Sequence, residues 1–270
     1  MCRWLAYGGP PIALERLLFE PDNSLIRQSL SSKLGRAVTS GDGFGVGWYG
    51  ARAIPGQYRD TFPAWNDANL RSVAEQIESR LFFAHVRATT GTATARTNCH
   101  PFRHGAWLFM HNGRIGGYLE IRHELDRRIR PDLYANRLGS TDTEAMFLLA
   151  LANGLESDPL GAMNATIAEI EGVMRAHGVD EPLHMTVAAT DGERIIAYRY
   201  ASDHAPPSLF YIQGAALGPR IGRDADGAIL ILSEPLDEET GDWIEVPDAH
   251  MLVAERGEVT LTPLAPAAAP

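Results

Sequence analysis

Cysteine is scarce in this chain, with only Cys2 and Cys99 among 270 residues. Two cysteines cannot form the disulfide framework of a small secreted domain, and the segment MCRWLAYGG lacks the basic and apolar parts of a secretory signal. The sequence also has no apolar run near the ~20 residues that a membrane-spanning helix needs. We therefore expect a cytoplasmic protein without a membrane segment.

Basic residues are also in short supply, because 24 Lys and Arg stand against 34 Asp and Glu and give a formal net charge of −10. Nucleic-acid phosphates are bound mainly by Lys and Arg, so we do not expect nucleic acid as a partner. A content of 45% hydrophobic residues is enough to build a sizeable core at this length. We expect one domain over residues 1–264, followed by a disordered Ala/Pro tail at 265–270.

Hydrophobic patterning predicts three strands in the first half of the chain. Residues 2–7 alternate in side-chain direction and should end at the turn-forming stretch Gly8–Pro11. Residues 81–88 form a buried strand, and residues 105–113 form another that the turn dipeptide Asn112-Gly113 should stop. Side chains at such strand ends are held on a rigid scaffold, which makes them candidates for a functional site.

The stretch GDGFGVGWYG at 41–50 is rich in glycine but has neither the GxxxxGK[ST] nor the GxGxxG spacing of a phosphate-binding loop. We interpret it as a glycine-rich strand. The missing side chains permit the close approach of another backbone or of a ligand, and a bulge or turn explains the glycines equally well.

The second half predicts helices first and strands afterwards. Residues 142–154 are apolar nearly all round, which predicts a central buried helix, and residues 159–177 predict a second long helix. From residue 183 onward the pattern is that of strands, beginning with a hairpin at Asp191-Gly192. This order predicts an α+β fold in which sheets are covered by helices.

Four segments carry the residues that could do chemistry: Cys2, HVRATTG at 85–91, NCHPF at 98–102 and FMHNG at 109–113. A cysteine nucleophile needs a base, because a free thiol with a pKa near ~8.5 is mostly protonated at neutral pH. If Met1 is removed, the α-amine of Cys2, with a reference pKa of ~7.7–8.0, can accept the thiol proton. Cys2 is therefore a candidate nucleophile that carries its own base.

The other segments each fit two interpretations. Asn112-Gly113 could supply an amide side chain and a backbone N–H to an oxyanion, or it could form a tight turn. Arg87 needs an anionic partner if it is buried, because burying an unpaired charge is costly. His85 and His111 fit either hydrogen-bonded core residues or site residues.

Taken together, these segments resemble the class II glutamine amidotransferases, whose glutaminase domain is an N-terminal-nucleophile (Ntn) hydrolase. The matching motifs span nearly the whole chain: MCR at 1–3, GFGVGWY at 43–49, HVRATTG at 85–91, NCHPF at 98–102, HNGRI at 111–115, STDTE at 140–144 and SEPL at 233–236. The chain is most similar to the stand-alone members, which lack a fused synthase domain. The resemblance implies a four-layer αββα sandwich of two antiparallel sheets flanked by helices.

The resemblance also implies roles for particular residues. Cys2 is the nucleophile, and Asn112 and Gly113 form the oxyanion hole. Arg87 binds the α-carboxylate of a γ-glutamyl substrate, a task suited to a planar guanidinium, and Asp142 binds the α-ammonium group. No cofactor and no metal are implied.

Some neighbouring residues receive no role. Family members often have one more residue between the arginine and the Ala-Thr pair than the sequence Arg87-Ala88-Thr89-Thr90 has, so the contacts of both threonines stay open. The matching loops also bring Asp42, Trp48 and His100 toward the pocket, and Cys99 should pack as a small buried residue.

We therefore expect an enzyme that hydrolyses a γ-glutamyl amide through a thioester on Cys2 and releases glutamate and ammonia or an amine. The same chemistry fits a glutaminase subunit that passes ammonia to a separate synthase or amidase. Two other classes stay open: a catalytically silent regulatory or binding protein of the same fold, and a zinc protein. Zinc could use His85, Cys99, His100, His104 or His111, although their spacing does not match paired zinc-ligand motifs.

Overall fold

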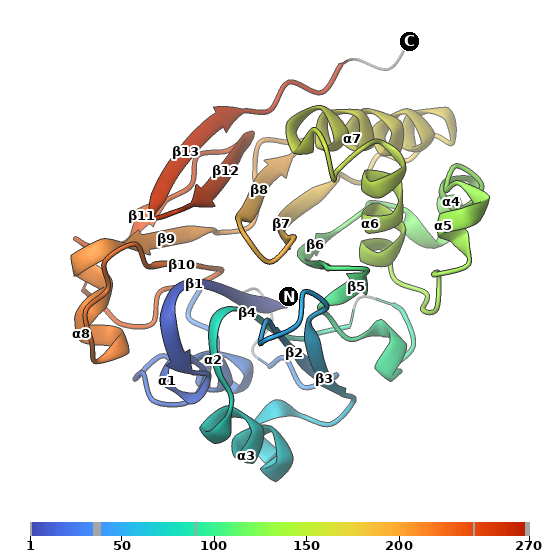
Figure 1. Cartoon of the computed structure of the whole chain (residues 1–270). Coiled ribbons are helices and arrows are strands. Elements are labelled where there is room, and N and C mark those ends of the chain that lie inside the picture. Colours follow the sequence, from blue (N-terminus) through green and yellow to red (C-terminus); the bar gives the residue numbers. More distant parts are fainter. Residues whose placement is uncertain (1, 35–38, 90, 240, 268–270) are drawn as a thin grey trace.

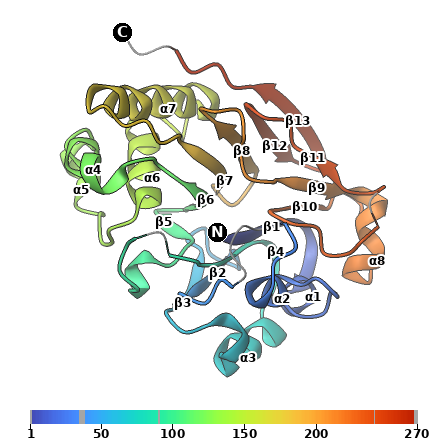
Figure 2. The same cartoon turned by 180° about the vertical axis from the view of Figure 1, so that it is seen from behind.

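A computed structural model describes residues 2–34, 39–89, 91–239 and 241–267 of the chain. Two antiparallel sheets lie face to face, and helices cover the outer face of each sheet (Figure 1). The opposite view shows the same two groups of helices on either side of the paired sheets (Figure 2). The α+β fold and its four αββα layers, expected from the sequence, are confirmed.

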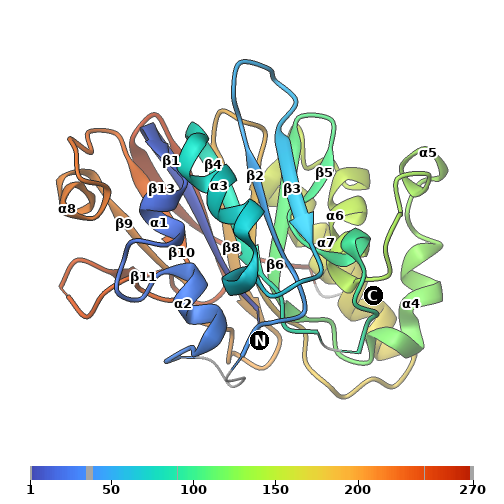
Figure 3. The same cartoon turned by 90° about the horizontal axis from the view of Figure 1, so that it is seen from below.

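The first sheet has seven strands in the order β11-β9-β10-β1-β4-β2-β3. Their bounds are β1 Arg3–Ala13, β2 Phe44–Trp48, β3 Gly56–Asp60, β4 Glu78–Val86, β9 Phe210–Gln213, β10 Ile229–Leu232 and β11 Ile244–Glu245. Its outer face carries α1 Glu15–Leu18, α2 Leu25–Leu30, α3 Ala68–Gln76 and α8 Gly218–Ile221. Figure 3 shows α1, α2 and α3 lying across this sheet.

The second sheet has six strands in the order β13-β12-β8-β7-β6-β5. Their bounds are β5 Phe102–His104, β6 Trp107–Arg114, β7 His184–Thr190, β8 Ile195–Ala201, β12 His250–Glu255 and β13 Glu258–Pro263. Its outer face carries α4 Tyr118–Asp126, α5 Pro131–Tyr134, α6 Asp142–Ala152 and α7 Pro159–Ala176. Three short 3-10 helices complete the fold: η1 Ala64–Asn66, η2 Arg96–Asn98 and η3 Gly214–Leu217.

Apolar side chains fill three separate layers, and β1 contributes to two of them. Trp4 and Ala6 point into the layer between the sheets, whereas Leu5 and Tyr7 point into the layer under the first group of helices. Because successive side chains of a strand point to opposite faces, a strand buried on both sides is apolar at most of its positions. The alternation predicted for residues 2–7 is confirmed, and it holds the segment next to Cys2 rigidly between the layers.

Helix α6 is buried as predicted, with residues 143–151 all buried. Thr141 caps its first turn by accepting a hydrogen bond from the Glu144 N–H at 3.2 Å. This cap fixes where the helix begins, and therefore fixes the position of Asp142, which is its first residue.

Two predicted strand ends are wrong. Strand β1 continues through Gly8–Pro11 to Ala13, with a register shift between Gly8 and Ile12. Strand β6 continues through Asn112-Gly113 to Arg114, which pairs with His184 of β7. In both places, pairing with neighbouring strands outweighs the local preference of Gly and Pro for turns.

Other elements were not expected from the sequence. Helix α2 is one of them, and its N-cap Ser24 accepts a hydrogen bond from the Arg27 N–H. Strands β3 and β13 were also missed. Met1 and Thr90, like residues 268–270 of the expected Ala/Pro tail, lie outside the described residues.

Gly43, directly before β2, and Gly45 and Gly47 within β2 make room for other segments of the chain. A Cβ atom would lie 2.6 Å from Cys99 Sγ at Gly43, 2.1 Å from the His100 carbonyl oxygen at Gly45 and 2.8 Å from a Leu108 methyl at Gly47. A side chain at Gly45 would collide with the backbone that follows η2, and side chains at Gly43 and Gly47 would collide with the side chains of Cys99 and Leu108. Of the two explanations left open by the sequence, close approach of another backbone is therefore the correct one.

Candidate active site

Cys2 lies directly before β1 and is half-buried. Its Sγ accepts a hydrogen bond from the Ala88 N–H at 3.4 Å, and the thiol lies 3.5 Å from the Ala88 carbonyl oxygen. Ala88 follows β4, whose Val86 pairs with Arg3 of β1. The pairing of β1 with β4 thus places the thiol beside the residue that follows Arg87.

Arg87 is buried and held by neutral acceptors. Its Nη1 donates to the Asp42 carbonyl oxygen at 3.3 Å, and its Nη2 donates to the hydroxyls of Thr89 at 3.1 Å and Thr92 at 2.7 Å and to the Ala93 carbonyl oxygen at 3.3 Å. Among the described residues, no carboxylate lies within 4 Å of this guanidinium. The fold therefore orients a buried cation without neutralising it.

Asn112 and Gly113 lie in the last part of β6. The amide of Asn112 is buried, and neither its Nδ2 nor its Oδ1 has a hydrogen-bond partner in the described part of the chain. Gly113 has a φ of +148°, and a Cβ there would lie 2.0 Å from the His184 carbonyl oxygen. Only glycine fits this position, and the neighbouring amide is free to bond a ligand.

Asp142 is half-buried at the start of α6. Its Oδ2 accepts a hydrogen bond from the Ile115 N–H at 3.0 Å, and its Oδ1 accepts one from the Thr143 N–H at 2.8 Å. The carboxylate also lines a cavity of about 190 Å³, together with Thr92, Ile115 and six further residues: Arg114, Gly117, Tyr118, Leu119, Glu120 and Glu181. Two backbone bonds hold the carboxylate at the wall of this open cavity.

Cys2, Arg87 and Asp142 share one neighbourhood. Burial raises the pKa of the Cys2 thiol above its ordinary value; the Ala88 hydrogen bond and the charge of Arg87 lower this pKa, while the charge of Asp142 raises it. The thiol thus lies within electrostatic range of both charges. An unpaired cation and an anion flank one cysteine.

Trp4 connects β1, which directly follows Cys2, to the strand that carries Asn112 and Gly113, across the two sheets. Its indole N–H donates to the Thr186 hydroxyl at 3.3 Å, and that hydroxyl donates to the Asn112 carbonyl oxygen at 3.3 Å. Thr186 is also the β7 partner of Asn112. Strand β1, which directly follows Cys2, is therefore tied to the strand that carries Asn112 and Gly113.

Three buried histidines lie in the layer beneath the site. The rings of His85 and His100 contact each other with centroids 4.1 Å apart and planes tilted by 37°, and His85 Nε2 donates to the His111 carbonyl oxygen at 3.2 Å. His111 Nε2 donates to the His184 carbonyl oxygen at 3.2 Å, which leaves its Nδ1 to accept from the Thr143 hydroxyl at 3.0 Å. Burial lowers the pKa of His85 to about 3 and lowers those of His100 and His111 as well. These rings are neutral core groups that support the site.

Sequence reasoning missed the buried ion pair beside Cys2. Arg3 Nε and Glu234 Oε2 lie 3.3 Å apart, and Arg3 Nη1 donates to the Cys2 carbonyl oxygen at 2.9 Å. Glu234 also accepts hydrogen bonds from Ser32 and Asn23. Glu234 belongs to the SEPL segment at 233–236, which matched a family motif but received no functional role from the sequence. The pair fixes the backbone on which the thiol is mounted.

The remaining residues named from the sequence take structural positions. Thr89 accepts from Arg87 and donates to the Thr92 carbonyl oxygen at 2.6 Å, so it helps to hold the guanidinium. Cys99 is buried as expected, with its Sγ 3.2 Å from the Asp60 carbonyl oxygen. Trp48 does not line the site, because it packs on the helix-covered face of the first sheet.

The described ranges contain neither a candidate metal site nor a candidate membrane-spanning helix. No group of three His, Cys, Asp or Glu side chains is arranged there to hold a metal ion. No helix in these same ranges has both the length and the apolar character that crossing a membrane demands.

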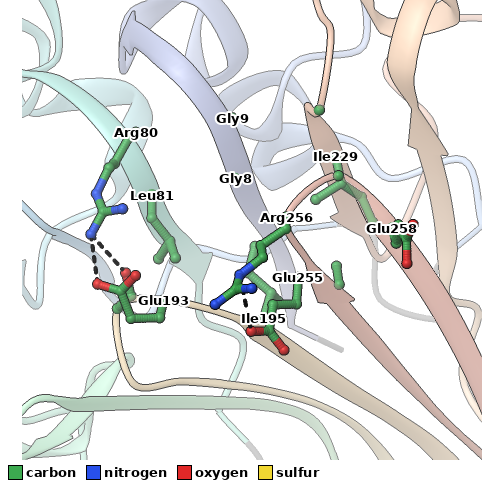
Figure 4. A pocket seen from close by; sticks show the side chains of 14 residues that line it. Gly8, Gly9, Arg80, Leu81, Glu193, Ile195, Ile229, Glu255, Arg256 and Glu258 are labelled. Carbon is green, nitrogen blue, oxygen red and sulfur yellow. Dashed lines mark hydrogen bonds and ion pairs between the residues drawn. The ribbon is translucent and has the colours of Figure 1, made fainter.

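A second cavity, of about 230 Å³, opens at the opposite end of the sandwich (Figure 4). Gly8 and Leu81, which line it, pair with each other several residues along β1 and β4 from the Cys2 end. Four of its charged side chains form two ion pairs, Arg80 with Glu193 at 2.9 Å and Arg256 with Glu255 at 3.7 Å, and Glu258 also lines it. None of the five residues predicted for the site lines this cavity.

Comparison with known proteins agrees with the fold. The family model of the class II glutamine amidotransferases matches residues 21–269. The solved structure of a protein from Silicibacter pomeroyi, described as a glutamine aminotransferase class-II domain protein, superposes with a TM-score of 0.76 at 38% identity, covering 98% of this chain and all of that one. The glutamine phosphoribosylpyrophosphate amidotransferase of Bacillus subtilis shares the fold at 14% identity, with a TM-score of 0.61 over 98% of this chain and 49% of that chain.

Curated relatives extend over the same length. The probable glutamine amidotransferase DUG3 of Saccharomyces cerevisiae is 35% identical over 98% of this chain and 84% of its own length. The γ-glutamyl-hercynylcysteine sulfoxide hydrolase of Mycolicibacterium smegmatis is 28% identical over 98% of this chain and its entire length. With its Ntn-type αββα fold, the chain belongs to the class II glutamine amidotransferase family of enzymes.

Proposed function

We propose that this chain hydrolyses the amide bond of γ-glutamyl compounds, with glutamine as the simplest substrate, through a γ-glutamyl thioester on Cys2. The observation that carries the proposal is that Arg87 lowers and Asp142 raises the pKa of the same Cys2 thiol. The two side chains do not pair with each other, because their hydrogen bonds go to other groups. A free amino-acid end is a zwitterion, and one cation and one anion at fixed positions match it.

Each end of the zwitterion has its own partner in this proposal. The Arg87 guanidinium binds the α-carboxylate, which supplies the negative charge that no described neighbour gives it. The Asp142 carboxylate, held by the N–H groups of Ile115 and Thr143, binds the α-ammonium group. With both ends fixed, the γ-carbonyl carbon is directed to Cys2.

The reaction needs the thiol proton to leave, and burial, which raises the Cys2 pKa, makes this harder. Removal of Met1 would free the Cys2 α-amine to take the proton. The sulfur then attacks the γ-carbonyl carbon, and the α-ammonium returns the proton to the departing ammonia or amine. Water attacks the thioester next, which releases glutamate and restores the thiol.

The developing oxyanion requires donors that are in place before the reaction. The Asn112 Nδ2 is buried and unbonded in the described part of the chain, and the backbone N–H of Gly113 lies next along β6. We assign both to the oxyanion hole. A preorganised donor of this kind contributes about 10²–10³ in rate in other hydrolases.

The leaving group sets the biological role. The Mycolicibacterium smegmatis relative is named a hydrolase of a γ-glutamyl compound, which favours amines and peptides as leaving groups alongside ammonia. The Saccharomyces cerevisiae relative is named a probable glutamine amidotransferase, which favours ammonia delivered to a separate synthase or amidase. A partner-dependent glutaminase should be slow alone, whereas a γ-glutamyl hydrolase should be fast alone.

The decisive experiment is intact-protein mass spectrometry before and after incubation with 6-diazo-5-oxo-L-norleucine, a glutamine-like electrophile, with peptide mapping of any adduct. We expect loss of Met1 and a single adduct on Cys2. The Cys2→Ala variant, which still contains Cys99, is the matched control and should give no adduct. A Met1-processed protein without an adduct would favour a silent regulatory or binding protein.

Hydrolysis assays complete the test. The wild-type protein should release glutamate from glutamine or from a γ-glutamyl dipeptide, and Cys2→Ala should not. Full hydrolysis by Cys2→Ala would disprove the proposed mechanism.

A further inference from the structure

Asn98 links the two segments that carry the charges of the site. It is the last residue of η2 and is buried. Its Nδ2 donates to the Ala93 carbonyl oxygen at 2.8 Å and to the Ser140 hydroxyl at 2.9 Å, and its Oδ1 accepts from the Ser140 N–H at 2.7 Å. One amide therefore bonds both the loop after β4 and the loop before α6.

The orientation of this amide is fixed by its partners. A backbone N–H can only donate, so the oxygen of Asn98 must face Ser140. A carbonyl oxygen can only accept, so the nitrogen must face Ala93. Exchanging the amide atoms would break both bonds, which makes asparagine the side chain that fits this junction.

On one side, the Asn98 amide reaches Arg87 through a shared carbonyl. The Ala93 carbonyl oxygen accepts from Asn98 and also from Arg87 Nη2 at 3.3 Å. On the other side, Ser140 lies two residues before Asp142, and a Cβ at Gly139 would lie 2.4 Å from Asn98 Oδ1. The absence of a side chain at Gly139 permits the close approach.

The loop before α6 is anchored from the helix as well. The Glu144 carboxylate accepts from the N–H groups of Leu138 at 3.1 Å and Gly139 at 2.7 Å. This anchor holds the loop to α6 but does not reach the Arg87 loop. Within the described residues, Asn98 is the side chain whose hydrogen bonds connect Ser140 with Ala93.

We infer that Asn98 is a positioning residue that sets the separation between Arg87 and Asp142, and through it the selection of substrates with a free α-amino acid end. The inference rests on the proposed function, because it takes these two charges as the binding partners of the α-carboxylate and the α-ammonium. Asn98 itself does not touch the reacting atoms in this scheme. Its effect should therefore appear in substrate selection and KM.

The test compares three amides: glutamine, glutaramate, which lacks the α-amine, and 4-aminobutyramide, which lacks the α-carboxylate. The wild-type enzyme should prefer glutamine over both by kcat/KM. Asn98→Asp keeps the bond to the Ser140 N–H but loses both donated bonds and sets an oxygen against Ala93. We expect the preference for glutamine over each analogue to fall about tenfold, mainly through KM, in line with the loss of one or two hydrogen bonds.

Two further variants separate positioning from folding. Asn153→Asp is the matched control, because its Nδ2 donates to Thr166 at 3.1 Å at the far end of α6. It should lower the melting temperature without changing the preference among amides. Ser140→Ala removes one acceptor of Asn98 and should lower the preference less than Asn98→Asp does, and it decides the question if Asn98→Asp fails to fold.

The outcomes distinguish the two proposals. An unchanged preference in the folded variants, at full or uniformly reduced activity, overturns the positioning role while the proposed function stands. A processed wild-type enzyme that hydrolyses no amide overturns both. A reduced preference with near-normal kcat supports the positioning role.

Discussion

The backbone N–H of Ile115 donates a hydrogen bond to Asp142 Oδ2 at 3.0 Å. Ile115 follows β6 directly, and Asp142 begins α6, so this bond joins the strand of the proposed oxyanion hole to the helix that carries the proposed ammonium-binding group. The two parts of the site are therefore fixed relative to each other by the backbone, whereas the Arg87 side depends on the Asn98 amide.

Opposite charges should move the reactivity of Cys2 in opposite directions. Asp142 raises and Arg87 lowers the pKa of the thiol. Asp142→Asn should therefore shift the pH profile of Cys2 alkylation to lower pH, and Arg87→Gln should shift it to higher pH. Iodoacetamide labelling rates, mapped by mass spectrometry to distinguish Cys2 from Cys99, measure both shifts.

The matched control for this pair is Asp132→Asn, since Asp132 is exposed and pairs locally with Arg130. It should leave the alkylation profile where the wild-type profile lies. Shifts of the same sign in Asp142→Asn and Arg87→Gln would contradict the arrangement of charges around Cys2.

Breaking the buried ion pair should be costly. Glu234→Gln leaves the Arg3 guanidinium, which is 1% exposed, without a carboxylate. We expect a loss of about 3 kcal/mol in the free energy of unfolding, measured by urea denaturation. Because Arg3 also bonds the Cys2 carbonyl oxygen, kcat should fall as well.

Glu238→Gln provides the comparison, because Glu238 pairs with Lys33 at the surface, where both side chains are well exposed. Surface pairs contribute little, so the unfolding curve should stay unchanged. Equal losses in the free energy of unfolding in the two variants would mean that the Arg3–Glu234 pair stabilises the fold no more than a surface pair does.

The glycine-rich strand should not accept side chains. In Gly45→Ala, the new Cβ would lie 2.1 Å from the His100 carbonyl oxygen, and backbone on both sides would have to move. We expect a loss of about 3 kcal/mol or more, or failure to fold. Gly50→Ala, where no atom lies within 4 Å of the new Cβ, should be neutral in the same denaturation experiment.

Acid should destabilise the protein through its buried histidines. The pKa of His85 is about 3 in the folded state, against an ordinary value of 6.5, and that of His100 is also well below 6.5. As the pH falls below 6.5, the unfolded chain binds protons that the folded chain does not, so stability is lost between about pH 6.5 and 3. The expected slope is about 1.4 kcal/mol per pH unit for each such histidine.

His100→Leu removes one of these groups and should reduce the stability lost between pH 7 and pH 5 by about 2 kcal/mol. Chemical denaturation at the two pH values measures the loss. His123→Leu, at a position whose side chain is largely exposed, should leave the pH dependence as in wild type. The same slope in His100→Leu and wild type would contradict the neutral state of the buried ring.

Local patterns predicted those parts of the fold in which one segment decides its own structure. The alternation at residues 2–7 and the apolar surface of 142–154 predicted β1 and α6 correctly. The extension of β1 through Gly8–Pro11 could not be predicted, because it depends on pairing with β4 and β10.

Motifs indicated the candidate site residues but not the contacts among them. Asn112-Gly113 has the composition of a turn, and only its pairing with Thr186 and Met185 of β7 makes it part of a strand. Asn98 lay inside the NCHPF motif without a role, because its partners Ala93 and Ser140 lie in loops whose approach is a property of the whole fold. Glu234 escaped assignment for the same reason.

The uncompensated charge of Arg87 ties the stability of the protein to its ligands. A fold that buries a cation without a described counter-charge gains free energy whenever an anion of the right shape binds there. By mass action, a ligand at a hundredfold excess over its Kd adds about 2.7 kcal/mol to the folded state. We therefore expect glutamate to raise the melting temperature, so that the protein is most easily unfolded, and most exposed to proteolysis, when its own substrates and products are scarce.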